Sequence, residues 1–269
     1  MARSEMNASA SPHLGIVLIH HRMADHLRRC LGSIRTQNPP WPMATVVAHY
    51  RTEADPGDWI AREFPWARLV WAERFGISHM RNLGLEGVAD ARHKLILDVD
   101  AELQPGALEE LARFLEAETQ AGAVGPRTVR PDGSLEHNAK RFYDWTTLSV
   151  RRSPLNWLWP RNPWNRRHLM MEIDHSRPFA CDWVAGACML LRGEALQQVG
   201  PFDERYTFGF EDVDWCLRAR QAGWQVYYCP SATVVHHVQR RSASGLNTLT
   251  LEHLKSLWRF CRKHGRLGP

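Results

Sequence analysis

The sequence predicts an α/β fold, with an open, mostly parallel sheet flanked by helices. Short apolar runs alternate with amphipathic stretches in the first half of the chain, a pattern typical of strand–helix–strand units. Four of these runs occur before residue 100, which is enough for one continuous sheet. With 269 residues, of which 44% are hydrophobic and 23% charged, the chain has room for one large domain or two small ones. We expect a single domain.

Strands and helices are expected to alternate up to residue 117. The pattern predicts strands at Leu14–Ile19, Thr45–Tyr50, Arg68–Ala72 and His93–Leu97, and helices at Ala24–Gln37, Ile77–Val88 and Pro105–Ala117. Pro39–Pro40 stops the first helix. Pro105 suits the start of a helix, because the N–H group that proline lacks would have no partner there.

The middle of the chain, from Arg141 to Cys181, breaks this pattern. It has no sustained period of 2 or 3.6 residues, and it is rich in tryptophan, arginine and proline. A loop of this length inside a compact domain is usually functional or disordered, and its aromatic residues argue against full disorder. We expect a partly ordered Trp/Arg-rich excursion from the domain.

Regular structure is expected again after the excursion. The pattern predicts an ordered segment at Asp182–Arg192, then short helices, two strands at Gln225–Tyr228 and Thr233–His236, and a last helix at about Asn247–Lys263.

Composition and charge exclude several classes of protein. The 34 Lys+Arg against 29 Asp+Glu give a net charge of +5, and the composition is not that of a disordered or fibrous chain. The longest apolar run, Trp183–Leu191, is far shorter than the ~18 residues of a transmembrane helix. Residues 1–12 lack the apolar segment of a signal peptide and are expected to form a flexible tail. The six cysteines form no C-x-x-C pair, so we expect reduced thiols in a cytoplasmic protein.

Two carboxylates follow the fourth predicted strand. Asp98 and Asp100 are two residues apart, so in an extended chain their side chains point the same way at the strand's carboxyl end. Open α/β sheets bind ligands at this edge, and paired carboxylates suit Mg²⁺ or Mn²⁺. The alternative interpretation is a charged turn before the next helix.

A second group of acidic residues lies among aromatic ones. Asp203 and Glu204 precede it, and Glu211 and Asp212 begin a predicted helix whose dipole stabilises their anionic forms. Asp214 is spaced to pair with an arginine one turn later, so capping and a surface ion pair explain it.

A histidine ends the last predicted strand. The imidazole of His236 could supply a third metal ligand at the same sheet edge. The alternative is an ordinary polar residue, since the chain has 14 histidines.

Taken in order, these segments resemble a known enzyme family. The motifs are Arg81-Asn82-Leu83-Gly84, Asp98-Val99-Asp100, Asp182-Trp183-Val184-x-Gly186-Ala187, Arg192, Phe202-Asp203-Glu204, Phe210-Glu211-Asp212-x-Asp214-x-x-x-Arg218 and His236. Each is weak alone, but in this order they resemble the GT-A glycosyltransferases of family 2, particularly the bacterial rhamnosyltransferase-like branch. The resemblance implies a Rossmann-like GT-A domain over residues 13–245, with an acceptor-side excursion at 141–181. A basic amphipathic helix would follow at 246–269.

The resemblance also implies a reaction, the metal-dependent, inverting transfer of a sugar from a nucleoside-diphosphate donor. By this resemblance, Asp98, Asp100 and His236 hold Mn²⁺ or Mg²⁺, and Asp98 also meets the sugar diphosphate. Asp212, in the catalytic pair with Glu211, is the general base that takes the proton of the acceptor hydroxyl. The sugar and acceptor pocket is assigned to Trp183, Gly186, Ala187, Asp203 and Glu204.

One departure from the family pattern concerns the nucleotide. The family commonly carries Asp or Asn at the end of the second strand, where this chain has Ala48-His49-Tyr50-Arg51. His49 or Arg51 would then contact the base, and Arg81 and Asn82 would complete the donor site. This altered strand end also motivates a rival interpretation, a non-catalytic GT-A-like protein that binds a carbohydrate or a partner.

The implied partners are a dTDP- or UDP-linked sugar and a saccharide or polyprenyl-linked acceptor. The last predicted helix combines Leu251, Leu254 and Trp258 with lysine and arginine. Such a helix either rests on an anionic membrane surface or packs on its own domain. We expect peripheral contact with the inner face of the plasma membrane. No nucleic-acid partner is expected, because the chain has no helix-turn-helix, zinc-ligand or RNP-like pattern.

Overall fold

The structure, a computed structural model, describes residues 13–51, 55–151, 153, 156, 158–237 and 248–265. The tail predicted at residues 1–12 lies outside these ranges. The first half holds strands β1 (Leu14–His20), β2 (Met43–Tyr50), β3 (Ala67–Ala72), β4 (His93–Asp98), β5 (Ala101–Leu103) and β6 (Ala121–Val129), with helices α1 (Ala24–Arg35), α2 (Gly57–Glu63), α3 (Ile77–Gly87) and α4 (Ala107–Ala117). The predicted strands and helices of this half are therefore present, within about two residues at each end.

The second half is less regular. It holds strands β7 (Leu135–Glu136), β8 (Ala139–Lys140), β9 (Phe179–Cys181), β10 (Trp183–Val184), β11 (Cys188–Leu191) and β12 (Gln225–His236), with helices α5 (Trp145–Arg151), α7 (Pro163–His168), α8 (Gly193–Val199), α9 (Glu211–Gln221) and α10 (Thr248–His264). The excursion is thus partly ordered, and its end, β9, pairs with β12 of the main sheet.

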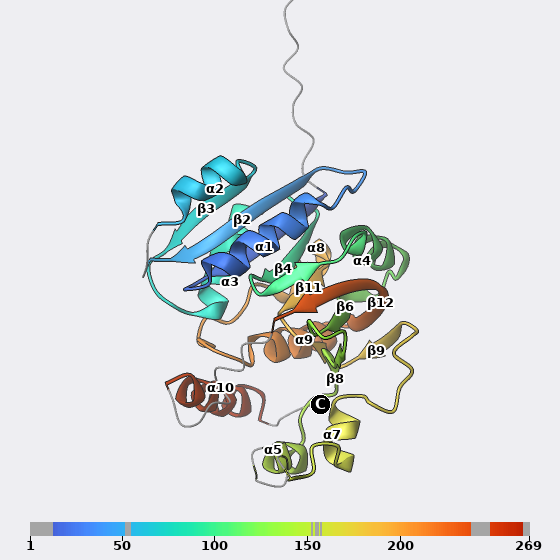
Figure 1. The fold of residues 1–269 in the computed structure, drawn as a ribbon. Coiled ribbons are helices and arrows are strands. Elements are labelled where there is room, and N and C mark those ends of the chain that lie inside the picture. Colours follow the sequence, from blue (N-terminus) through green and yellow to red (C-terminus); the bar gives the residue numbers. More distant parts are fainter. Residues whose placement is uncertain are drawn as a thin grey trace, which may run out of the picture.

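One large sheet organises the described part of the chain (Figure 1). Its strand order is β3-β2-β1-β4-β11-β6-β12-β5, with β7 beside β6 and β9 beside β12. Strands β1 to β4 are parallel to one another, while β11 runs antiparallel to both β4 and β6. The prediction of an α/β fold with an open, mostly parallel sheet flanked by helices is confirmed.

Alternation along β1 shows how the sheet makes two cores. Ile16 and Leu18 point to the face covered by α1 and α4, and Val17 points to the face covered by α3 and α9. All three side chains are fully buried, as expected for a parallel strand with helices on both faces.

Two element predictions need correction, and strand β6 was not predicted. The β6 sequence AGAVGPRTV contains two glycines and a proline; close packing on Val184 and Trp224 explains the glycines. The two strands predicted at the end are one strand, β12, with a register irregularity between Cys229 and Thr233. Helix α4 begins at Ala107, after Gly106 in a left-handed conformation, rather than at Pro105.

Candidate active site

The carboxyl ends of β4 and β12 bring two of the predicted site residues together. His236 ends β12, and the main-chain N–H of His237 donates to the carbonyl of Asp100 at 2.8 Å. The side chains follow, with His236 Nε2 lying 3.4 Å from Asp100 Oδ1. Segments 136 residues apart in sequence therefore meet at the sheet edge where α/β folds bind ligands.

A second carboxylate, Glu136, also contacts His236, and the sequence analysis missed it. His236 Nδ1 donates to Glu136 Oε2 at 2.8 Å. Burial alone would lower the pKa of His236, but its hydrogen bonds to Asp100 and Glu136 raise that pKa to about 10. Glu136 lies in the short strand β7, which no motif marks; no signal in the sequence could have identified it.

These residues fit a divalent cation, which would take the place of the Nε2 proton of His236 while Glu136 keeps the Nδ1 proton. With Nδ1–H donating to Glu136, the Nε2 atom faces Asp100 as a ligand atom would, and a carboxylate behind a metal-binding histidine is the usual arrangement. Two ligands of one ion at about 2.1 Å from it lie about 3 Å apart, close to the 3.4 Å between Nε2 and Oδ1.

The third predicted ligand, Asp98, is paired with Arg81. Its Oδ1 accepts from Arg81 Nη2 at 3.0 Å, so one of its oxygens is already engaged by the guanidinium. Asp98, Asp100 and His236 do not bring three ligand atoms within 4.8 Å of one another, which among the described residues only His13, His93 and Glu116 do. The structure thus brings Asp100 and His236 together, and Asp98 as a third ligand stays a prediction.

Arg81 is the centre of a buried network. The residue is 1% exposed, and its guanidinium donates to Asp98 at 3.0 Å, to Glu211 at 2.9 Å and to the carbonyl of Gly186 at 2.9 Å. A Cβ atom at Gly186 would lie 2.5 Å from Arg81 Nη1, so this glycine makes room for the arginine. The predicted donor contact of Arg81 would have to compete with these bonds, and the geometry favours a positioning role.

Glu211 and Asp212 face different surroundings, although they are adjacent. Glu211 is buried against Arg81, and burial, together with the neighbouring charge of Asp212, raises its pKa to about 7. Asp212 is partly exposed in the first turn of α9, and its Oδ2 accepts from the N–H of Gly186 at 3.0 Å. Asp212 is thus the one of the pair that can reach a substrate, and Glu211 positions the helix start.

Of the predicted sugar and acceptor residues, Gly186 contacts Asp212 directly. Trp183 is buried, and its Nε1 donates to the carbonyl of Arg141 at 3.0 Å. Ala187 accepts from the N–H of Asp98 at 2.9 Å, so the Gly186–Ala187 segment joins the two carboxylate groups. Lys140, which the sequence analysis missed, places its Nζ 4.2 Å from the centre of the Trp183 ring. Burial lowers the pKa of Lys140 to about 8, against the charge of Asp212.

Asp203 and Glu204 are engaged in ion pairs. Asp203 binds Arg205 at 2.6 Å and Lys263 of α10 at 2.8 Å. Glu204 binds Arg74 and lies 3.1 Å from His79 Nδ1. Their contacts fix the segment before α9, and the acceptor contact expected of both residues stays a prediction.

The predicted donor residues are mostly buried. His49 is fully buried, with its Nδ1 2.8 Å from that of His20, and the amide of Asn82 is bonded to the main chain of Phe202 in both directions. Burial, followed by the charge of His49, lowers the pKa of His20 to about 4, so His20 is neutral near pH 7. Arg51 is exposed at the end of β2, with its guanidinium 4.5 Å from the Trp71 ring. Of these residues, Arg51 is the one that a nucleotide base can reach.

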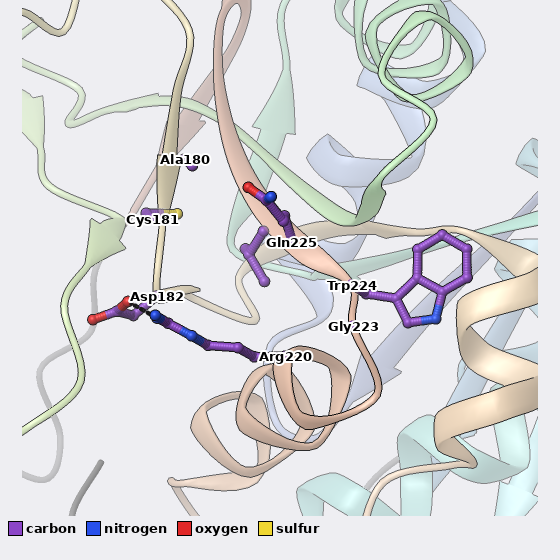
Figure 2. A pocket seen from close by; sticks show the side chains of 8 residues that line it. Ala180, Cys181, Asp182, Arg220, Gly223, Trp224 and Gln225 are labelled. Carbon is purple, nitrogen blue, oxygen red and sulfur yellow. Dashed lines mark hydrogen bonds and ion pairs between the residues drawn. The ribbon is translucent and has the colours of Figure 1, made fainter. Parts of the chain in front are cut away.

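Two other features lie away from these residues. A pocket between β9, the end of α9 and the start of β12 is lined by Cys181, Asp182, Arg220 and Trp224, with Arg220 paired to Asp182 (Figure 2). It lies at the opposite end of β12 from His236.

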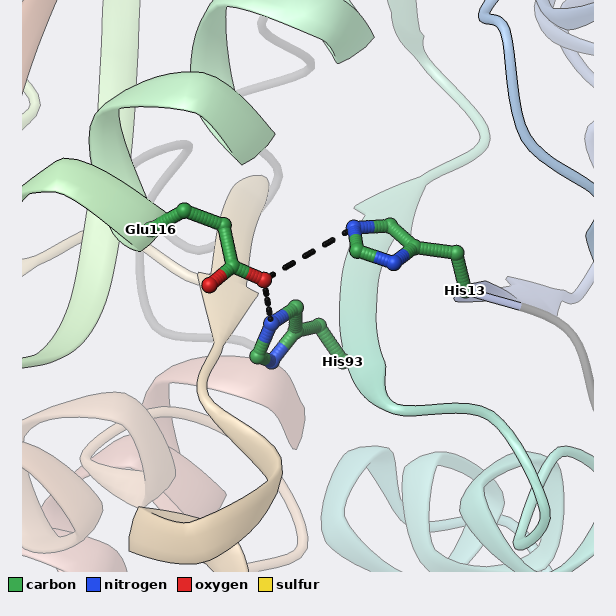
Figure 3. A group of neighbouring side chains, drawn as sticks. All are labelled: His13, His93 and Glu116. Atoms are coloured by element: carbon green, nitrogen blue, oxygen red, sulfur yellow. Dashed lines mark hydrogen bonds and ion pairs between the residues drawn. The ribbon is translucent and has the colours of Figure 1, made fainter.

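The group of His13, His93 and Glu116 lies at the amino ends of β1 and β4 (Figure 3). His93 Nε2 is 2.8 Å from Glu116, while its Nδ1 accepts from the N–H of Gly193 at 3.3 Å. A neutral histidine that accepts at Nδ1 carries its proton on Nε2, so Nε2 donates to Glu116 and is not a metal ligand.

Comparisons with known proteins identify the family of this chain. A family model described as "Glycosyltransferase like family 2" matches residues 16–266. An N-acetylglucosaminyl-diphospho-decaprenol L-rhamnosyltransferase of Mycobacterium tuberculosis is 34% identical over 260 residues, covering 92% of this chain and 83% of the relative. Rhamnosyltransferase WbbL of Escherichia coli is 35% identical over 79 residues, covering 29% of this chain and 30% of the relative.

Two solved structures share the fold. GalNAc-T7 with UDP, GalNAc and Mn²⁺ superposes with a TM-score of 0.66 at 13% identity, covering 93% of this chain and 48% of that one. The mannosyltransferase PcManGT of Pyrobaculum calidifontis with GDP-Man and Mn²⁺ gives a TM-score of 0.62 at 18% identity, covering 94% and 65%. At these identities the likeness concerns the fold alone.

Proposed function

Because this chain is a glycosyltransferase that belongs to family 2, in its bacterial rhamnosyltransferase-like branch, we propose that it transfers an L-rhamnosyl residue to a polyprenyl-linked saccharide. The M. tuberculosis relative, whose name specifies such a donor sugar and acceptor, supports this proposal. The donor would be a dTDP- or UDP-linked sugar. The rival interpretation, a non-catalytic binding protein, is disfavoured by the family assignment and by a partly exposed Asp212 at the site.

The observation that carries the proposal is the placement of Asp212. Its carboxylate is held by the Gly186 N–H at the start of α9, where the helix dipole favours the anion that a general base needs. The neighbouring residue Glu211 forms a buried ion pair with Arg81, which holds the start of α9, and with it Asp212, in place.

The reaction would be a single displacement that inverts the anomeric carbon. Asp212 takes the proton of the acceptor hydroxyl, whose oxygen forms the new bond to the anomeric carbon. The bond between that carbon and the diphosphate oxygen breaks, and the nucleoside diphosphate leaves with the electron pair. The charge of Lys140, beside Trp183, would stabilise the anionic groups in the site.

Asp100 and His236 would hold a divalent cation, Mn²⁺ or Mg²⁺, with Glu136 fixing the imidazole. Such an ion supplies positive charge for the leaving diphosphate. On the donor side, we propose that Arg51 contacts the nucleotide, with His49 supporting the end of β2 from the core.

We also propose a cytoplasmic protein with peripheral membrane contact. Among the described helices, none is both long and apolar enough to cross a membrane. A polyprenyl-linked acceptor lies at a bilayer surface, and α10 carries exposed Leu251, Leu254 and Trp258.

Calorimetric binding of dTDP and UDP, with and without Mn²⁺, tests the donor site. We expect one nucleotide to bind at least about tenfold more tightly with Mn²⁺, because an ion held by Asp100 and His236 would supply positive charge for the diphosphate. Asp100→Ala should abolish this gain, and Asp58→Ala, an exposed carboxylate of α2, should retain it. Nucleotide binding that is indifferent to Mn²⁺, or a gain that survives Asp100→Ala, would contradict the assignment.

A further inference from the structure

Helix α10 has one buried face and one exposed apolar face. Ser256 and Phe260 on the inner face are fully buried. Leu251, Leu254 and Trp258 recur at helical spacing on the outer face, where they are 54%, 38% and 60% exposed. An apolar stripe on a helix whose other side is already packed has no partner within the described part of the chain.

The inner face binds the segment that leads into the catalytic helix. Thr207 donates to Glu252 of α10 at 2.6 Å, and Arg259 donates to the carbonyl of Arg205 at 2.5 Å. The ring of Phe210 lies 5.4 Å from that of Phe260. Phe210 directly precedes Glu211 and has a left-handed φ of 70°, a conformation that a bulky residue keeps only when its surroundings hold it.

The end of α10 is bonded to α9 itself. Asp214, which is fully buried, receives Lys263 and His264 of α10 at 2.8 Å each and Arg218 of its own helix at 2.8 Å. The ion pair with Arg218 that the sequence predicts is therefore present, but Asp214 is buried and also attaches α10. Asp214 lies two residues after Asp212 in α9.

The outer face carries the kinds of side chain that bind an anionic bilayer surface. Lys255 and Arg262 are exposed beside the apolar stripe, and the Arg262 guanidinium lies 5.3 Å from the Trp258 ring. Tryptophan and leucine suit the boundary between headgroups and acyl chains, and basic side chains bind lipid phosphates.

A second set of exposed apolar side chains lies at the same end of the molecule. Helices α5 and α7 of the excursion lie at the end where α10 lies, and β8 lies between them and the sheet (Figure 1). This region exposes Trp145 at 61%, Leu158 at 71% and Trp159 at 51%, next to the exposed Arg161. Two separate segments thus present the same combination of aromatic and basic residues.

We propose that this surface, which we call the lipid face (Leu251, Leu254, Lys255, Trp258 and Arg262 of α10, with Trp145, Leu158 and Trp159), docks on a bilayer containing anionic phospholipids. Through its inner face, α10 then holds Phe210 and Asp212 at the membrane surface, where a polyprenyl-linked acceptor presents its saccharide. The membrane partner follows from the lipid face itself, and the placement of the acceptor rests on the proposed function.

Vesicle flotation tests the docking directly. We expect the protein to float with vesicles of phosphatidylglycerol and phosphatidylethanolamine and not with pure phosphatidylcholine vesicles. The double variant Leu254→Asp/Trp258→Asp should bind at least tenfold more weakly. Trp66→Asp is the matched control, since Trp66 is 40% exposed but lies between α2 and β3, away from α10. Equal flotation of the double variant and the wild type, or no flotation of the wild type, would overturn the proposal.

Two acceptors separate this inference from the proposed function. On a long-chain polyprenyl acceptor in vesicles, the double variant should lose at least tenfold in rate. On a short-chain, water-soluble acceptor, it should match the wild type and Trp66→Asp, with an unchanged thermal midpoint. If a folded variant lost the same factor in rate on both acceptors, the lipid face would support the active site and not membrane binding, which would overturn the proposal. Flotation of a wild type that transfers to neither acceptor would instead refute the proposed function and leave the docking intact.

Discussion

At the scale of single residues, Arg81 joins segments that are far apart in the chain. It bonds Asp98 after β4, Glu211 at the start of α9 and the carbonyl of Gly186 between them. The sequence motif around Arg81 indicated a functional residue, but its role depends on partners 17, 105 and 130 positions away, which spacing cannot pair. The same limit explains why the contacts of Glu136 with His236 and of Asp98 with Arg81 were not predicted. Asp100, His236 and Asp212 could be proposed from the sequence because each stands near the end or the start of a predicted element.

Replacing Arg81 should destabilise the fold. In Arg81→Gln, Glu211 loses its partner while buried, and a broken buried ion pair costs about 3–5 kcal/mol. Urea unfolding measures this loss. The matched control is Arg113→Gln, whose exposed pairs with Glu109 and Glu110 are worth less than about 1 kcal/mol. The double variant Arg81→Gln/Glu211→Gln should recover part of the loss, and a loss below about 1 kcal/mol in Arg81→Gln would contradict the network.

At the scale of elements, packing decided which sequence patterns could be interpreted. The parallel strands β1, β2 and β4 are apolar runs that are mostly buried, and β3, at the end of the sheet, is a half-buried apolar run, so the sequence predicts all four within two residues. Strand β6 is equally buried but contains Gly122 and Gly125, whose missing side chains make room for Trp224 and Val184. A glycine that makes room for a residue distant in sequence cannot be told from a loop glycine by the residues next to it in the chain.

Two helical glycines should respond in opposite directions to alanine. Gly84 of α3 packs on Val17 of β1, where an added Cβ would collide, so Gly84→Ala should cost about 1–3 kcal/mol. Gly32 of α1 has nothing within 4 Å of an added Cβ, and Gly32→Ala should raise the free energy of unfolding by about 0.5–1 kcal/mol. Chemical denaturation of both variants checks the pair. If Gly84→Ala were the more stable of the two, the close packing of α3 on the sheet would be wrong.

At the scale of the whole molecule, buried histidines link stability to pH. Burial, with the added charge of neighbouring basic or histidine side chains, lowers the pKa of His20 to about 4 and of His168 to about 2. Their unfolded value is about 6.5, so below that pH the unfolded chain binds protons that the folded chain does not, and stability falls as pH falls. Glu211 acts oppositely, because its folded pKa of about 7 lies above the unfolded value.

The net effect should be a loss of about 2–3 kcal/mol per pH unit as the pH falls from 6.5 to 4.5, since three histidines outweigh one glutamate: burial also lowers the pKa of His137, to about 4. Urea unfolding at several pH values measures the slope. His168→Leu should flatten it, because one of the three histidines is gone. A slope that His168→Leu leaves unchanged would show that His168 is not held neutral by the fold.

The central claim, that this glycosyltransferase moves rhamnose with Asp212 as its base, is tested most directly by one transfer assay. The reaction would contain Mn²⁺, a dTDP- or UDP-linked rhamnose and an N-acetylglucosaminyl-diphospho-polyprenol acceptor, with the wild type and Asp212→Asn compared. We predict rhamnosyl transfer by the wild type and a rate lower by a factor of about 10² to 10⁴ in Asp212→Asn, with nucleotide binding unchanged. No transfer from either donor by the folded wild type, or a rate within threefold of the wild type in Asp212→Asn, would contradict it.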